Sequence, residues 1–115
     1  MTIRQKLICI LLIVPNLVFA LNPSAIQLNQ KYSSKGMINL RETPPKTVFY
    51  ILGDKKGLVN QNDSFKVKEI KEIKTLFDKH YWLKIERKNP NTMEMETGWI
   101  YAGKAGGESL VEIAK

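Results

Sequence analysis

The stretch "TGWIY", Thr97 to Tyr101, places a tryptophan and a tyrosine at alternate positions of a short run that follows a glycine. Alternate side chains of a β-strand face opposite sides of a sheet. Ile100 should therefore face one side, and Trp99 and Tyr101 the other. The pattern predicts a strand over Gly98 to Ala102 with one apolar face and one aromatic face.

Other short runs have the same strand-like composition. "MINLRE" alternates apolar and polar residues and stops before Pro44-Pro45, which cannot continue a ladder. "KKGLVNQND" (Lys55 to Asp63) is interpreted as a loop, and "KNPNT" (Lys88 to Thr92) as a hairpin tip. The predicted strands are Met37 to Glu42, Val48 to Leu52, Phe65 to Ile70, Tyr81 to Ile85 and Gly98 to Ala102.

The stretch from Phe65 to Phe77 fits two periods. Phe65 and Val67 alternate with lysines, as in a strand, but apolar residues also recur at helical spacing up to Phe77. Lysine and glutamate favour a helix, whereas the neighbouring short strands favour a strand. We expect a strand over Phe65 to Ile70, and a loop over Lys71 to Lys79 with a possible helical turn.

Strand parity also predicts a core. Leu83, Ile85 and Ile100 fall on the same predicted apolar face. The remaining predicted core residues are Leu40, Val48, Tyr50 or Ile51, and Val67. Several short strands separated by turns predict an all-β fold, a small antiparallel barrel or sandwich.

The N-terminus has the pattern of a secretory signal. Arg4 and Lys6 precede the uncharged stretch Leu7 to Ala20, which is shorter than a membrane span. We expect cleavage between Ala20 and Leu21 and export to the periplasm or the extracellular space. The alternatives are an uncleaved anchor and a buried helix.

The chain beyond the expected cleavage site contains no cysteine, so no disulfide can stabilise it. Loss of two basic residues from the signal leaves 16 basic and 11 acidic residues, a net charge of +5, which suits acidic partners. The polar segment 21–35 is interpreted as a flexible linker or arm, although it could add a strand to the domain. Residues 108–115 are interpreted as a C-terminal tail.

Three motifs resemble the bacterial Src homology 3 (SH3)-like domain. "INLRETPP" is similar to its opening "LNVRSGPS", "YWLKIE" to its strand "GWYKVR", and "TGWIYAG" to its closing "TGWVYSS". The motifs occur in the order of the family, within residues 36–107. The interval between the second and fourth strands is longer here than in short members of the family.

The resemblance implies a five-stranded, strongly bent barrel whose loops border a shallow groove, and a role in recognition. Parity leaves Trp82, Trp99 and Tyr101 on the outer face, where they either pack under loops or form a contact platform. The resemblance places Trp82 and Tyr101 on the groove, and we expect Lys84, on the same strand face as Trp82, to lie at its rim. Trp99 is a further groove candidate or a half-buried cover.

The residue inventory argues against catalysis. His80 is the single histidine, and after the expected cleavage no cysteine remains, so a cysteine–histidine pair cannot form. Glu94 and Glu96 share a strand face, but among lysines a solvated surface is the simpler interpretation. We expect no enzyme activity, no cofactor and no metal site.

Two binding hypotheses remain. The first is an exported recognition module for a cell-wall polymer, either peptidoglycan or an anionic glycan. The second is a protein-interaction module that binds a peptide or a partner subunit of an envelope complex. Nucleic acid is a third conceivable ligand because of the basic charge, but an export signal argues against it.

The signal interpretation makes a direct prediction. The protein recovered from the periplasm or medium of expressing cells should have the mass of residues 21–115, as measured by intact-mass spectrometry. A mass that retains Met1 to Ala20 would contradict cleavage and favour the anchor.

Overall fold

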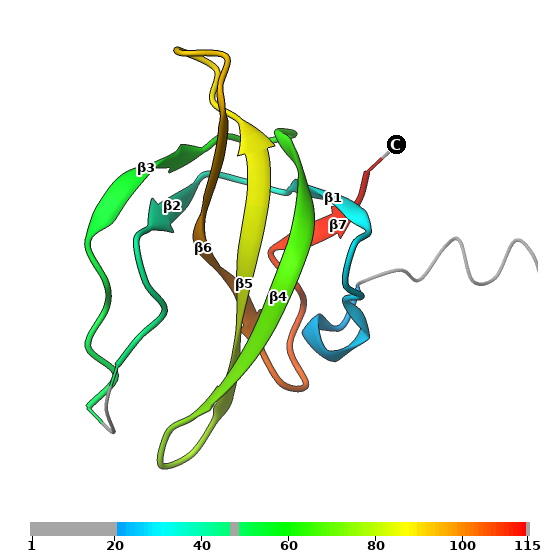
Figure 1. Cartoon of the computed structure of the whole chain (residues 1–115). Coiled ribbons are helices and arrows are strands. Elements are labelled where there is room, and N and C mark those ends of the chain that lie inside the picture. Colours follow the sequence, from blue (N-terminus) through cyan, green and yellow to red (C-terminus); the bar gives the residue numbers. More distant parts are fainter. Residues whose placement is uncertain (1–20, 47–48, 115) are drawn as a thin grey trace, which may run out of the picture.

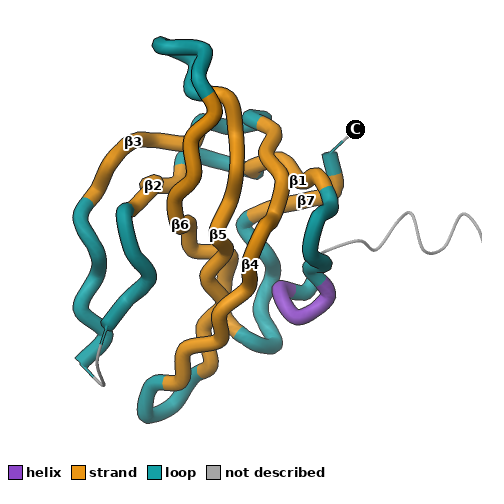
Figure 2. Tube along the Cα trace, viewed as in Figure 1, coloured by secondary structure: helices purple, strands orange, loops and turns teal. Residues whose placement is uncertain are grey.

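The computed structural model describes residues 21–46 and 49–114. These residues form one antiparallel sheet of seven strands that curls into a half-barrel, preceded by a short 3-10 helix, η1 (Pro23–Ala25) (Figure 1). Figure 2 shows that, within the described residues, helix is confined to η1. The prediction of an all-β fold is confirmed. The expected signal peptide, including Ala20, lies outside the described residues.

Within the described residues, none of the helical segments has the length and hydropathy of a membrane span.

The strand order in the sheet is β3-β2-β6-β5-β4-β1-β7. The strands are β1 (Lys31–Ser34), β2 (Ile38–Arg41), β3 (Lys55–Val59), β4 (Ser64–Lys74), β5 (Lys79–Lys88), β6 (Met95–Lys104) and β7 (Val111–Ile113).

β-Bulges help the sheet to curl. At each of three register shifts, one residue has no partner on the neighbouring strand: Lys56 in β3, Lys68 in β4 and Ala102 in β6. A bulge bends its strand and increases the local twist. The long strands β4, β5 and β6 therefore wrap around the core instead of forming a flat sheet (Figure 1).

The core lies inside the curl, and most of the predicted core residues belong to it. Leu40, Val67, Leu83, Ile85 and Ile100 are fully buried, which confirms their predicted inward direction. The complete cluster is Ile26, Tyr32, Ile38, Leu40, Val59, Phe65, Val67, Tyr81, Leu83, Ile85, Ile100, Ala102 and Val111.

The sheet has more strands than the five predicted. β1 pairs with β4 and β7, so the segments interpreted as a flexible linker and a C-terminal tail both contribute strands. The alternative in which the N-terminal segment adds a strand is confirmed. Tyr32 is buried, and its hydroxyl accepts a hydrogen bond from the backbone of Gln27 at 2.9 Å. Tyr32 and the buried Ile26 thus hold a segment whose composition is mostly polar.

The predicted strand Val48 to Leu52 is wrong in its described part. Tyr50 lies in a turn with a φ of 56°, and Ile51 forms only an isolated bridge with Lys46. Neither Tyr50 nor Ile51 belongs to the core cluster, and Val48 lies outside the described residues. Tyr50 instead packs against Trp82 on the outer face of the sheet. The strand lies instead at β3, inside the predicted loop.

The predicted loop over Lys71 to Lys79 is also wrong. β4 continues to Lys74, a tight turn follows, and β5 begins at Lys79, so no helical turn is present there. Pairing with β5 along this length satisfies the backbone of β4, and this tertiary contact overrides the helix propensity of lysine and glutamate.

The core makes a stability prediction. Ile85→Ala and Ile100→Ala should each lower the free energy of unfolding by about 2–5 kcal/mol, because each leaves a cavity at a fully buried site. Glu94→Ala, at an exposed position, should change it by less than about 0.5 kcal/mol. Urea unfolding measures all three. An Ile100→Ala variant as stable as the parent would contradict this packing.

Candidate functional site

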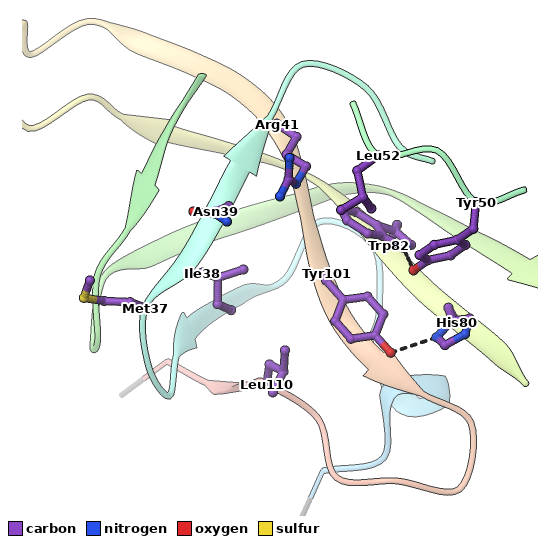
Figure 3. A pocket seen from close by; sticks show the side chains of 10 residues that line it. All are labelled: Met37, Ile38, Asn39, Arg41, Tyr50, Leu52, His80, Trp82, Tyr101 and Leu110. Atoms are coloured by element: carbon purple, nitrogen blue, oxygen red, sulfur yellow. Dashed lines mark hydrogen bonds between the residues drawn. The ribbon is translucent and has the colours of Figure 1, made fainter. Parts of the chain in front are cut away.

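The candidate site lies where β2 separates from β6. Among the described residues the two strands share one register pair, Arg41 with Trp99. Just beside it, Leu40 packs so closely on Gly98 that a Cβ there would lie 2.6 Å from the leucine side chain. Beyond this point a cavity of about 410 Å³ opens (Figure 3). Its lining residues are Met37, Ile38, Asn39, Arg41, Tyr50, Leu52, His80, Trp82, Tyr101 and Leu110.

Tyr50 covers the tryptophan of the cavity wall. The Trp82 side chain comes from β5, is 3% exposed, and donates a hydrogen bond from Nε1 to the Tyr50 hydroxyl at 2.7 Å. The left-handed backbone of Tyr50 is uncommon for a residue with a Cβ. The hydrogen bond to Trp82 is a contact that compensates for this conformation.

A second hydrogen-bonded pair adjoins the first. His80 Nδ1 lies 2.8 Å from the Tyr101 hydroxyl, and the Tyr101 ring centroid lies 5.4 Å from that of Trp82. The His80 ring in turn lies 5.0 Å from Tyr50. These four residues, Tyr50, His80, Trp82 and Tyr101, are called the aromatic cluster. Figure 3 shows them along one wall of the cavity.

Arg41 gives the cavity its positive charge. The side chain is half-buried, and Nη1 donates to the carbonyl oxygen of Gly53 at 2.8 Å. That bond uses one of the five guanidinium donors. No aspartate or glutamate is among the described lining residues. An anionic group of a ligand is therefore the natural partner for the remaining donors.

The structure brings two of the four predicted groove residues together. Trp82 and Tyr101 are register partners and both line the cavity. Trp82 is nevertheless buried beneath Tyr50, so it packs under a loop and does not form an open platform. Trp99 is 8% exposed, and both Trp99 and its register partner Lys84 lie outside the lining. Lys84 is therefore not part of this cavity, and its rim position stays a prediction.

Sequence reasoning missed other residues of the site. The sequence predicts a strand at Tyr50, a polar strand position at Arg41 and a C-terminal tail at Leu110, and none of these predictions points to the cavity. The signal for Arg41 was available, because strand parity places it on the same outer face as Trp99. The approach of Leu110 depends on the path of the chain after β6, which local patterns do not reveal.

Glu94 and Glu96, the two glutamates considered for catalysis, lie in different environments. Glu96 accepts a hydrogen bond from the buried Arg87 at 2.9 Å and another from Asn89, so its interpretation as a solvated residue is wrong. Glu94 is exposed. Within residues 21–46 and 49–114, no three His, Cys, Asp or Glu side chains gather in a way that could hold a metal ion.

The two tyrosine hydroxyls of the cluster have altered acidity. Burial raises the pKa of Tyr50 above its ordinary value, although the hydrogen bond from Trp82 lowers it in part. Burial likewise raises the pKa of Tyr101, with smaller contributions from Tyr50 and Asp78. Both groups therefore remain neutral hydrogen-bonding phenols through the physiological range.

The chain matches no protein-family model, no curated protein and no solved structure.

The raised pKa values predict a pH dependence. The unfolded phenols titrate near pH 10, so the stability that the two neutral tyrosines provide should be complete below that pH. It should decline as the pH rises through their higher folded-state pKa values. Ultraviolet titration of tyrosinate should show late-ionising groups, and Tyr50→Phe and Tyr101→Phe should each remove one. Ionisation of every tyrosine at the ordinary pKa would contradict the burial of both rings.

Proposed function

We propose that this chain is an exported, non-catalytic recognition module that binds an extended peptide segment of an envelope partner in the cavity between β2 and β6. One observation carries the proposal. From Ile38 to Leu40 the described chain gives β2 no partner strand on its β6 side, and the cavity lies at this unpaired side. A peptide in extended conformation can pair with such a strand through main-chain hydrogen bonds.

The lining suits a peptide with apolar side chains and one carboxylate. Met37, Leu52 and Leu110 are exposed apolar residues at the cavity, and Tyr101 adds a half-buried ring. Arg41 supplies a planar donor group that matches a carboxylate in a paired geometry. Such a peptide would place the apolar side chains along the cavity and its carboxylate, terminal or in a side chain, near Arg41.

A wall polymer is the second candidate ligand, and Arg41 together with Tyr101 favours it. Sugar rings stack on open aromatic faces, and an anionic glycan carries carboxylates or phosphates. However, the Trp82 face is buried and its Nε1 already donates to Tyr50. Tyr50 and Tyr101 both line the cavity, but each ring is half-buried and neither presents a fully open face for stacking, so the peptide is the better fit.

The proposal includes an SH3-like architecture and export. The three motifs that resemble the SH3-like family fall on β2, β5 and β6, which are neighbours in the sheet order, and this supports a common arrangement. β1 and β7 would then be additions to the five-stranded core. Export rests on the charge and hydropathy pattern of residues 1–20.

Binding should depend on two accessible residues of the cavity. A library of displayed peptides selected against the protein should yield apolar sequences with a carboxylate, and synthetic copies of these peptides are the probes. Tyr101→Ala and Arg41→Gln should each weaken their binding by at least about tenfold in fluorescence titrations, as expected for an aromatic anchor and a charge-assisted contact.

Lys84→Ala is the matched control, because Lys84 shares the outer face but lies outside the lining. It should bind like the parent, and all variants should be compared at equal folded fraction. Trp82→Ala is unsuitable, since the loss of a buried indole should destabilise the fold by about 3–5 kcal/mol. Purified peptidoglycan provides the other arm. The ligand would be the wall polymer, and the peptide proposal would be wrong, if the library yielded no binding peptide and the protein bound peptidoglycan in a way that both Arg41→Gln and Tyr101→Ala weakened.

A further inference from the structure

The turn between β4 and β5 presents two large apolar side chains to solvent. Leu76 is 87% exposed and Phe77 is 88% exposed. Thr75 and Asp78 close the turn, because the Thr75 amide donates to the Asp78 carbonyl at 2.8 Å. The two apolar residues therefore occupy its corner, at the end of the hairpin that projects from the sheet (Figure 1).

This composition is unusual for a turn. Corner positions of tight turns favour Gly, Pro, Asn, Asp and Ser, because these residues suit the backbone or bond to it. Leucine and phenylalanine offer neither advantage, and here they bury almost no surface within the fold. A position that breaks a local rule without a gain in packing is a candidate for an interaction outside the chain.

A neighbouring loop adds apolar surface at the same end of the molecule. Phe49 is 81% exposed and Ile51 is 58% exposed. The contact between the Tyr50 and His80 rings places this loop beside the first residues of β5. Both loops lie at the lower end of the half-barrel in Figure 1, opposite the β5–β6 turn.

Lysines surround the hairpin behind its tip. Residues 66–84 contain six lysines and three acidic residues, a net charge of +3. Lys71 and Lys74 are exposed, whereas Lys79 forms an ion pair with Glu72 at 3.1 Å. Asp78 is the acidic residue of the turn itself. An apolar tip with an excess of basic residues behind it is complementary to an anionic surface that has an apolar interior.

We propose that the β4–β5 turn docks the protein on an anionic lipid bilayer by inserting Leu76 and Phe77 at the boundary between headgroups and acyl chains. Lys71 and Lys74, the exposed lysines nearest the tip, then lie toward the lipid phosphates, where each basic residue adds to the attraction. The shape favours lipid over a protein partner. A stable protein interface covers about 800 Å² on each side, and the four exposed apolar side chains of these two narrow loops supply less.

Vesicle flotation tests the proposal with a matched pair of double variants. The vesicles are made of phosphatidylcholine with or without phosphatidylglycerol, and the protein is used as recovered from expressing cells. Leu76→Ser/Phe77→Ser should lower the partition coefficient on anionic vesicles by at least about tenfold, because two apolar side chains no longer enter the bilayer. The melting temperature should stay unchanged, since both residues are exposed.

Met93→Ser/Met95→Ser is the control at the opposite hairpin. These two methionines are 62% and 61% exposed, so the control also removes two exposed apolar side chains. Its partition coefficient should equal that of the parent. Partition of the parent should fall in neutral vesicles and at high salt.

A probe in the turn makes the test independent of how the N-terminal segment behaves. Brominated acyl chains should quench the tryptophan of a Phe77→Trp variant and leave that of a Met93→Trp variant unquenched. An unquenched Phe77→Trp would overturn the proposal, as would equal partition of the two double variants. If the tip variant lost self-association in sedimentation equilibrium and bound vesicles like the parent, the tip would contact a second copy, and the lipid proposal would be wrong.

Discussion

The rest of the structure depends on the close contact between β2 and β6. Leu40 of β2 packs directly on Gly98 of β6, and the adjacent residues, Arg41 and Trp99, form the register pair of the two strands. A Cβ at position 98 would force the Leu40 side chain to move and would lie 3.2 Å from the carbonyl oxygen of Arg41. Because β3 is attached to the sheet through β2, this contact joins β2 and β3 to the long meander of β4, β5 and β6. It draws the sheet into a half-barrel, and the separation of β2 from β6 beyond it forms the cavity.

The loop between β2 and β3 is held by contacts on the outer face of the sheet. Trp82 of β5 donates a hydrogen bond to the Tyr50 hydroxyl in the loop, and Arg41 of β2 donates one to the carbonyl oxygen of Gly53. The backbone amide of Glu42 closes the base of the loop by donating to Asp54 at 2.8 Å. These three hydrogen bonds attach the loop that carries Tyr50 to β2 and β5. Binding at such a site costs less conformational entropy than binding by a free loop.

Strand parity predicted the part of the fold that depends on alternation alone. Ile100, Leu83 and Ile85 lie in the core because one face of each strand must be apolar, and the same rule placed Trp82 and Tyr101 together on the other face. Parity cannot say whether an outer face is open or covered. Tyr50 covers Trp82 through a contact between residues 32 positions apart, and no local pattern encodes that contact.

The missed strands share one physical cause. β1 is mostly polar and β7 has only three residues, and both become strands because β4 and β1 offer them unpaired edges. β3 has two lysines and a glycine where a strand normally has apolar residues, and Val59 alone is fully buried. In such segments the partner strand supplies the stabilisation, and intrinsic propensity contributes little.

The aromatic cluster connects the two surfaces for which we propose partners. His80 lies 2.8 Å from the Tyr101 hydroxyl in the cavity, and its other ring nitrogen lies 3.4 Å from the hydroxyl of Thr75, which closes the β4–β5 turn. The cavity and the apolar turn are therefore linked through His80 and lie at the same end of the half-barrel. With the turn docked on a bilayer, the cavity would be held near the lipid surface. A partner segment close to the membrane could then reach it, whereas a segment that extends far from the membrane could not.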